Sequence, residues 1–143
     1  MSALISFFNA DVSYVLRNKT GIRLWLADVV KKEGFRLGEL SIILCSDEYL
    51  FKMNVQYLKH KTYTDIITFD QSESKEEVSG ELYISIDRIK DNAKTLDINI
   101  LDELHRVIVH GTLHLCGYGD KDSKSKSKMT QKENFYLLKR KFL

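Results

Sequence analysis

Hydrophobic and polar positions along this chain alternate with two different periods, which predict strands and helices in turn. Short β-branched or alternating runs predict strands at residues 4–8, 36–45, 65–69 and 80–86. Helical spacing predicts helices at 20–33, from 46 or 47 to about 57, from 87 or 91 to 96, and from about 100 to 116. The connection 70–79 is polar. We therefore expect an α+β fold with a small mixed four-stranded sheet and helices packed on it.

Two of the predicted helices have recognisable ends. The first buries an apolar stripe and stops at Gly34, a plausible helix terminator. The second begins at Ser46 or Asp47, either of which can cap a helix N-terminus.

The last part of the chain carries a different pattern. Lysines and serines alternate over residues 121–128 without apolar anchors, which predicts a mobile surface loop. Beyond it, Phe135, Leu138 and Phe142 recur at helical spacing within 129–142. We expect these three side chains to form the apolar face of the tail.

Length and composition indicate one globular domain over residues 1–143. The chain is 43% hydrophobic, which is ordinary for a core of this size. No apolar run approaches the roughly 18 to 20 residues that span a bilayer, and the first residues lack the pattern of a signal peptide, so we expect a cytoplasmic protein. Cys45 and Cys116 lie in apolar surroundings, which favours buried, reduced thiols.

Charge is unevenly distributed. The formal net charge is +2, but residues 121–143 hold eight Lys/Arg against Asp122 and Glu133, a local balance of +6 that leaves about −4 for the rest. A basic segment suits a polyanionic partner, although a solvated helix face is the simpler interpretation of a charge run alone.

The strongest chemical signal is a pair of histidines followed by a glycine-rich return to a carboxylate. His110 and His114 are four residues apart, so a helix places both imidazoles on one face. Gly117 suits the left-handed end of that helix, and Gly119 loosens the turn that leads to Asp120. The spacing H-x3-H-x2-G-x2-D predicts a three-ligand metal site.

Two imidazoles and a carboxylate suit zinc and leave a fourth position for water, as in catalytic sites. We expect His110, His114 and Asp120 to hold one divalent ion, most simply zinc, with metal-bound water as the catalytic group. Asp122 is an alternative third ligand. The frame is that of zincin peptidases of the metzincin type, but Gly111 stands where those enzymes carry their general-base glutamate, which disfavours proteolysis.

Two neighbouring titratable residues are not expected to join the site. Glu103 lies too far down the helix axis from His110 to act as a base, and we expect it to fix a neighbouring group. His105 points to another face and is interpreted as an ordinary histidine.

The segment HGTLHLCGY at 110–118 resembles the signature of the YbeY family, metal-dependent, single-strand-specific endoribonucleases that mature ribosomal RNA. The resemblance continues in ELHRVIV at 103–109, GELYIS at 80–85 and NVQYLKHKTYTDIITF at 54–69. Three positions depart from the family pattern. Asp120 replaces a histidine ligand, Leu58 replaces an arginine, and Tyr63 replaces a proline.

The resemblance also implies where RNA binds. It places the segment 59–61 beside the active cleft, so Lys59, His60 and Lys61 are candidate catalytic residues. Lys59 and Lys61 are also candidates for contact with phosphate. The alternative interpretation of this segment is an exposed loop. The aromatic rings of Tyr57 and Tyr63 are candidates for base stacking or for half-buried core. Lys121 and Lys124 of the basic segment complete the predicted substrate-binding residues.

The leading hypothesis is therefore a metal-dependent endoribonuclease of single-stranded RNA, acting in ribosomal RNA maturation and ribosome assembly or quality control and associating with the ribosome. Hydrolysis and attack by the RNA's own 2′-hydroxyl are both compatible with these residues. A zincin-type metallopeptidase and a non-catalytic, metal-stabilised ribosome- or RNA-binding protein are the alternatives.

Overall fold

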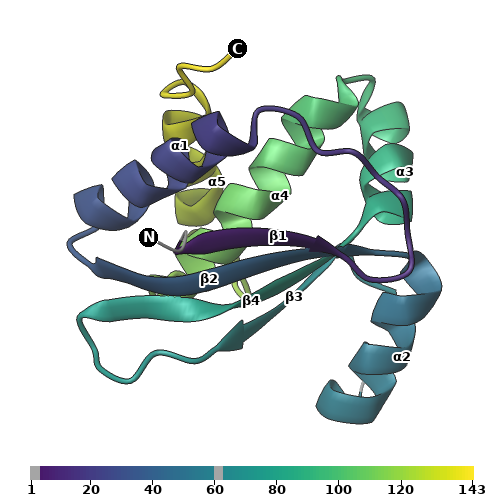
Figure 1. Ribbon diagram of the computed structural model, residues 1–143, viewed down its shortest axis with the longest axis horizontal. Coiled ribbons are helices and arrows are strands. Elements are labelled where there is room, and N and C mark those ends of the chain that lie inside the picture. Colours follow the sequence, from purple (N-terminus) through teal and green to yellow (C-terminus); the bar gives the residue numbers. More distant parts are fainter. Residues whose placement is uncertain (1–3, 60–62) are drawn as a thin grey trace.

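The fold is built on a mixed sheet of four strands in the order β1-β2-β4-β3. Strands β1, β2 and β4 are parallel, whereas β3 pairs antiparallel with β4 and forms an edge of the sheet. The computed structural model describes residues 4–59 and 63–143, which form β1 (Ile5–Asn9), α1 (Lys19–Lys32), β2 (Arg36–Cys45), α2 (Asp47–Leu58), β3 (Ile66–Asp70), β4 (Glu77–Ser85), α3 (Ile86–Leu96), α4 (Ile100–Leu115) and α5 (Ser123–Leu137). The predicted α+β fold with a small mixed sheet is confirmed (Figure 1).

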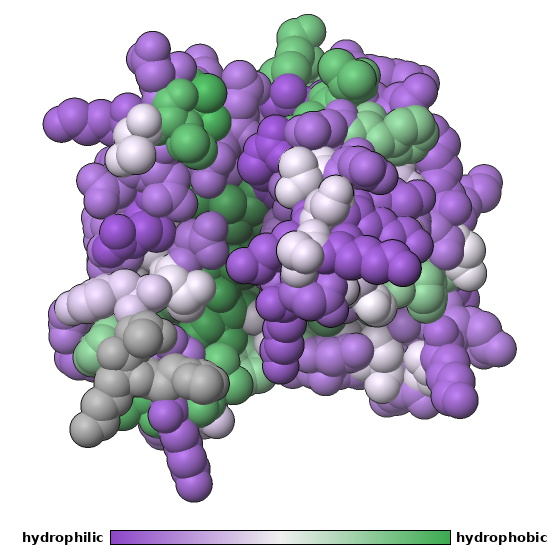
Figure 2. Space-filling view, turned by 180° about the vertical axis from the view of Figure 1, so that it is seen from behind, coloured by the Kyte–Doolittle hydropathy of each residue, from purple (hydrophilic) through white to green (hydrophobic). Residues whose placement is uncertain are grey.

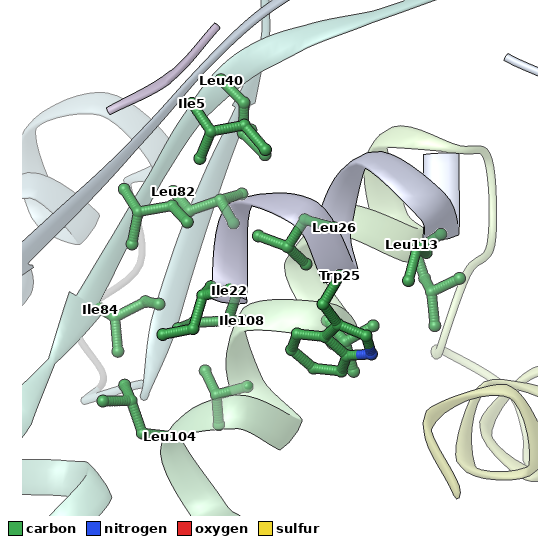
Figure 3. Packing of buried hydrophobic residues seen from close by; sticks show 14 of the residues in the cluster. Ile5, Ile22, Trp25, Leu26, Leu40, Leu82, Ile84, Leu104, Ile108 and Leu113 are labelled. Carbon is green, nitrogen blue, oxygen red and sulfur yellow. The ribbon is translucent and has the colours of Figure 1, made fainter. Parts of the chain in front are cut away.

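Helices α1, α4 and α5 lie on one side of the sheet and α2 lies on the other (Figure 1). Helix α4 contacts β3 and β4 directly, and α5 packs on α4. The main core lies between these layers, where Ile22 and Leu26 of α1 and Ile108 of α4 are fully buried against the sheet (Figure 3). Because α4 is buried on most of its faces, its position relative to the sheet is tightly fixed.

A smaller cluster lies under α2 on the opposite face of the sheet. It contains Cys45, Leu50 and Ile67, with Phe69 partly buried against them. Side chains alternate along a strand, so Ile67 and Phe69 of β3 face α2, whereas Ile66 packs on the main core. Strand β3 thus separates α2 from the histidine-bearing helix α4.

The basic segment is helical, so the prediction of a mobile loop at 121–128 is wrong. Helix α5 begins at Ser123, and the side chain of Asp122 caps it by accepting a hydrogen bond from the Ser125 N–H at 2.7 Å. Its buried positions are Met129, Glu133 and Tyr136, which lie on a different face from the predicted stripe. Phe135 and Leu138 are instead 46% and 86% exposed.

Two element boundaries also differ from the predictions. Strand β4 begins at Glu77 rather than within the expected 80–86, because Glu77 pairs in register with Arg36 of β2 and forms an ion pair with it at 3.1 Å. Helix α3 begins at Ile86, where Ser85 rather than an aspartate caps it. Among the helices of residues 4–59 and 63–143, none combines the length and apolarity that crossing a bilayer needs.

Candidate metal centre

The two histidines lie on the last turns of α4, and the chain turns back immediately after them. Gly117 ends the helix with φ 103°, in the left-handed region, and its N–H donates to the carbonyl of His114 at 3.0 Å. The turn returns Asp120 to the helix, where its Oδ2 lies 3.3 Å from Nε2 of His110 and 3.3 Å from Nε2 of His114. One donor atom from each residue lies within 4.8 Å of the others.

Each imidazole is held from behind by a hydrogen bond at its other ring nitrogen. Nδ1 of His110 lies 2.6 Å from Oε2 of Glu133 in α5, and Nδ1 of His114 lies 2.8 Å from the carbonyl oxygen of Tyr118. Both partners are acceptors, which assigns the proton to Nδ1 and leaves the Nε2 lone pairs facing Asp120. Metal-ligating histidines in proteins are oriented in the same way.

The donor set fits a divalent ion of the zinc type. Two neutral imidazole nitrogens and one carboxylate oxygen are the ligands of a three-residue catalytic zinc site with one open position. Cys116 is not among the described residues whose donor atoms gather at this point, and it lines a separate cavity. Burial raises the pKa of its thiol to about 12. Burial likewise raises the pKa of the Cys45 thiol to about 12, and both cysteines are free, although Cys116 is only partly buried rather than fully buried as expected.

Acidic groups dominate the electrostatics of the centre. Burial opposes protonation of His110, but the hydrogen bond and negative charge of Glu133 outweigh it and raise the imidazole pKa. Glu133 itself is paired on its other oxygen with Arg106 at 2.9 Å. Asp65, at the start of β3, has a raised pKa because it is buried near this acidic group. A divalent cation would relieve this concentration of negative charge.

A cleft of about 230 Å³ opens onto the two histidines and Asp120. Its opposite wall consists of Leu58 and the segment 64–68, which leads into the edge strand β3. Ile66 and Thr68 occupy the non-hydrogen-bonded positions of the ladder between β3 and β4. Their backbone N–H and C=O groups therefore point away from β4, toward the free edge of the sheet. Figure 2 shows the molecule from behind, where hydrophobic side chains lie in a hollow flanked by polar ones.

Helix α4 lies close to the sheet at Gly111. A Cβ there would lie 2.6 Å from Cδ1 of Ile66 and 3.0 Å from Cδ2 of Leu82. The glutamate that serves as base in metzincins would therefore require these two side chains to shift, which agrees with the sequence-based argument against proteolysis.

The structure distinguishes the two aspartates of the predicted turn. Asp120 reaches both imidazoles, whereas the side chain of Asp122 caps α5 and is not part of the ligand group. Glu103 is buried two turns before His110 on nearly the same side of α4 and is not part of the ligand group, as expected. His105 is buried on another face of the helix. His105 packs edge-on against Trp25 and accepts a hydrogen bond from Arg140 at 2.8 Å.

Of the described residues predicted to contact RNA, none lines the cleft itself, but Lys59, Tyr63 and Lys121 each adjoin in the chain a residue that does. Leu58 is at its wall and Lys59, in a left-handed conformation, ends α2 beside it. Tyr57 and Tyr63 are 59% and 54% exposed, Tyr57 edge-on to Phe69 and Tyr63 stacked on Phe51. Lys121 and Lys124 are exposed beside the start of α5. His60 and Lys61 lie outside the described residues.

Three groups of this centre were not found from the sequence. From the sequence alone, Glu133 is only a charge in a basic segment, Asp65 is only the start of a strand, and the Tyr118 carbonyl has no side-chain signal. Glu133 follows Met129 by four residues and precedes Tyr136 by three, so an acidic residue on an otherwise apolar face was the available clue.

The chain is similar to known proteins over nearly its whole length. The sequence model described as Endoribonuclease YbeY matches residues 9–141. The chain is 52% identical to a protein of that name from Cytophaga hutchinsonii, over 96% of both chains, and 42% identical to one from Amoebophilus asiaticus, over 95% of this chain and 92% of the other. A protein of Thermotoga maritima with a known solution structure superposes with a TM-score of 0.64 at 26% identity, covering 93% of this chain and 86% of that one.

Proposed function

Because the chain belongs to the Endoribonuclease YbeY family, we propose that it cuts single-stranded RNA in ribosomal RNA maturation, at a metal ion held by His110, His114 and Asp120. The observation that carries this proposal is the approach of one Asp120 oxygen to both Nε2 atoms, with each Nδ1 already bonded elsewhere. A ribonuclease with this role acts where ribosomes are assembled, so we also propose a cytoplasmic location and association with the ribosome.

The protein's own groups would prepare the site for chemistry. Glu133 and the Tyr118 carbonyl fix the tautomers and orientations of the two imidazoles, so that both Nε2 atoms are available to zinc. When bound, a divalent ion polarises a phosphoryl oxygen and lowers the pKa of a coordinated water. Asp65 is a half-buried carboxyl in the wall of the same cleft, where its raised pKa suits it to exchange a proton with a bound substrate.

We propose that lysines supply the positive charge that attracts the RNA backbone. Leu58 occupies the wall, so phosphate contact falls to Lys59, Lys121 and Lys124, which are exposed. Lysine binds phosphate as a point charge without the bidentate geometry of arginine. We propose that base stacking on exposed tyrosine rings, those of Tyr57 and Tyr63, contributes the remaining affinity for unpaired RNA.

The test compares two aspartates of the same turn. Asp120→Ala should lose bound zinc and cleavage of a labelled single-stranded RNA, whereas Asp122→Ala, the matched control, should keep both. The same RNA annealed to its complement should resist cutting. Retention of zinc and cleavage by Asp120→Ala would refute the ligand assignment.

The chemistry of the product ends separates the two cleavage routes. A 2′,3′-cyclic phosphate indicates attack by the RNA's own 2′-hydroxyl, whereas a 5′-phosphate with a 3′-hydroxyl indicates hydrolysis by water. A substrate with a single 2′-deoxy residue at the cut site provides the control, because only the first route requires that hydroxyl.

A further inference from the structure

The turn that carries Asp120 has little packing of its own. Cβ atoms added at Gly117 and Gly119 would meet nothing within 4 Å. A cavity of about 400 Å³ lies beside the turn, lined by Glu33, Phe35, residues 116–119, Ser125 and Lys128. A segment with so few contacts does not hold a ligand in place unless something else anchors it.

Tyr118 supplies that anchor. Its ring packs against the main core, and the ammonium groups of Lys128 and Lys132 both lie 5.8 Å from the ring centre. Its hydroxyl donates a hydrogen bond at 2.7 Å to Oε1 of Glu33. The backbone carbonyl of the same residue accepts the Nδ1–H of His114. One residue therefore joins a ligand imidazole to a carboxylate at the end of α1.

Glu33 is held rigidly enough to act as a fixed point. Its side chain is 8% exposed, and its second oxygen, Oε2, accepts hydrogen bonds from Lys132 at 3.2 Å and from the hydroxyl of Tyr136. Burial opposes ionisation of Glu33, but these donors outweigh it and lower the carboxyl pKa. Helix α5 is in turn tied to α1, because Nε1 of Trp25 donates to the Tyr136 carbonyl at 2.8 Å.

We propose that Glu33 is a positioning residue of the metal centre, acting through Tyr118 to orient His114 and the turn that returns Asp120. This inference rests on the proposed function, because it assigns a role toward the same ion. Glu33 lies 85 residues before Tyr118 and contacts none of the three ligands in the described structure. Its effect on them is therefore indirect.

The test is a thermodynamic cycle on zinc affinity, measured by competition with a chromogenic chelator. Tyr118→Phe keeps the ring and the carbonyl but removes the hydroxyl, and we expect zinc affinity to fall about tenfold. Glu33→Gln should cause a loss of similar size. The double variant should lose little more than either single variant, because both changes break one connection.

Tyr14→Phe is the matched control. It removes a hydroxyl from a ring that packs on the same core, but Tyr14 forms no hydrogen bond with Glu33 or Tyr118 in the described structure. Zinc affinity should change less than about twofold, while unfolding by urea shows whether folding stability has changed in either variant. A second readout needs no metal, since the hydrogen-bonded Nδ1–H signal of His114 should broaden in the NMR spectrum of metal-free Tyr118→Phe and persist in Tyr14→Phe.

Each outcome decides the inference. Equal losses of affinity in Tyr118→Phe and Tyr14→Phe, an unchanged affinity in Tyr118→Phe, or fully additive effects in the double variant would overturn it. Failure of the proposed function is recognised separately, because His114→Ala would then bind zinc as well as the parent protein.

Discussion

Replacing Glu133 by glutamine tests whether the carboxylate behind His110 controls metal binding. The two oxygens of Glu133 have different tasks, since Oε1 accepts from Arg106 at 2.9 Å and Oε2 accepts from Nδ1 of His110 at 2.6 Å. An amide has one oxygen and one NH₂ group, so it can accept from only one of these donors. Arg106 is always charged and offers only donors, so we expect the amide oxygen to turn toward it.

The amide NH₂ then faces His110 and forces the imidazole to accept at Nδ1. The proton moves to Nε2, which is the atom that must bind the ion. Loss of a hydrogen-bond acceptor that orients a metal-binding histidine lowers metal affinity by about 10- to 100-fold, which corresponds to about 1.4–2.7 kcal/mol. We expect the Glu133→Gln variant to fall within that range.

Chelator competition with zinc measures this effect, and Asn134→Ala is the control. Asn134 bonds the same guanidinium at 2.8 Å but is exposed and does not contact His110 in the described structure. Its loss should leave zinc affinity unchanged. If Glu133→Gln bound zinc within about twofold of the parent protein, the argument from tautomer control would be wrong.

Four further predictions concern stability. Burial and the charge of Arg140 lower the pKa of His105 from 6.5 to about 4. As the pH falls, the His105 imidazole therefore becomes protonated in the unfolded chain before it does in the folded one, and the free energy of unfolding should decrease between pH 6.5 and about 4 by up to about 3 kcal/mol. His105→Phe should reduce this pH dependence of stability in urea titrations. Trp25→Phe removes the donor to a buried carbonyl and should cost about 1–3 kcal/mol in the same assay. Asp122→Ala removes the α5 cap and should cost about 1 kcal/mol without changing zinc affinity. Zinc at about 1,000 times its dissociation constant should stabilise the protein by about 4 kcal/mol in thermal unfolding, and His114→Ala should abolish the increment.

Local pattern was sufficient for most of the fold. The strand at 36–45 and the helix at 20–33 were predicted within one residue of their observed ends, because their apolar periods are strong and their boundaries carry Gly34 and Ser46. Helix α5 was missed in its first turns because a lysine- and serine-rich segment has no apolar period. Its helical state depends on the Asp122 cap and on docking against α4.

The sequence by itself identified His110, His114 and Asp120 as candidate metal ligands. One helical turn and the glycine-containing turn that follows it bring these residues together through local geometry alone. The sequence could not determine what holds those ligands. Glu133 contacts His110 from another helix, and Glu33 contacts Tyr118 from 85 residues earlier in the chain. Contacts across such separations leave no periodic pattern in the sequence. The partners that hold the ligands depend on the packing of α1 and α5 around α4. Burial there brings together hydrogen-bond donors and acceptors that are far apart in the sequence.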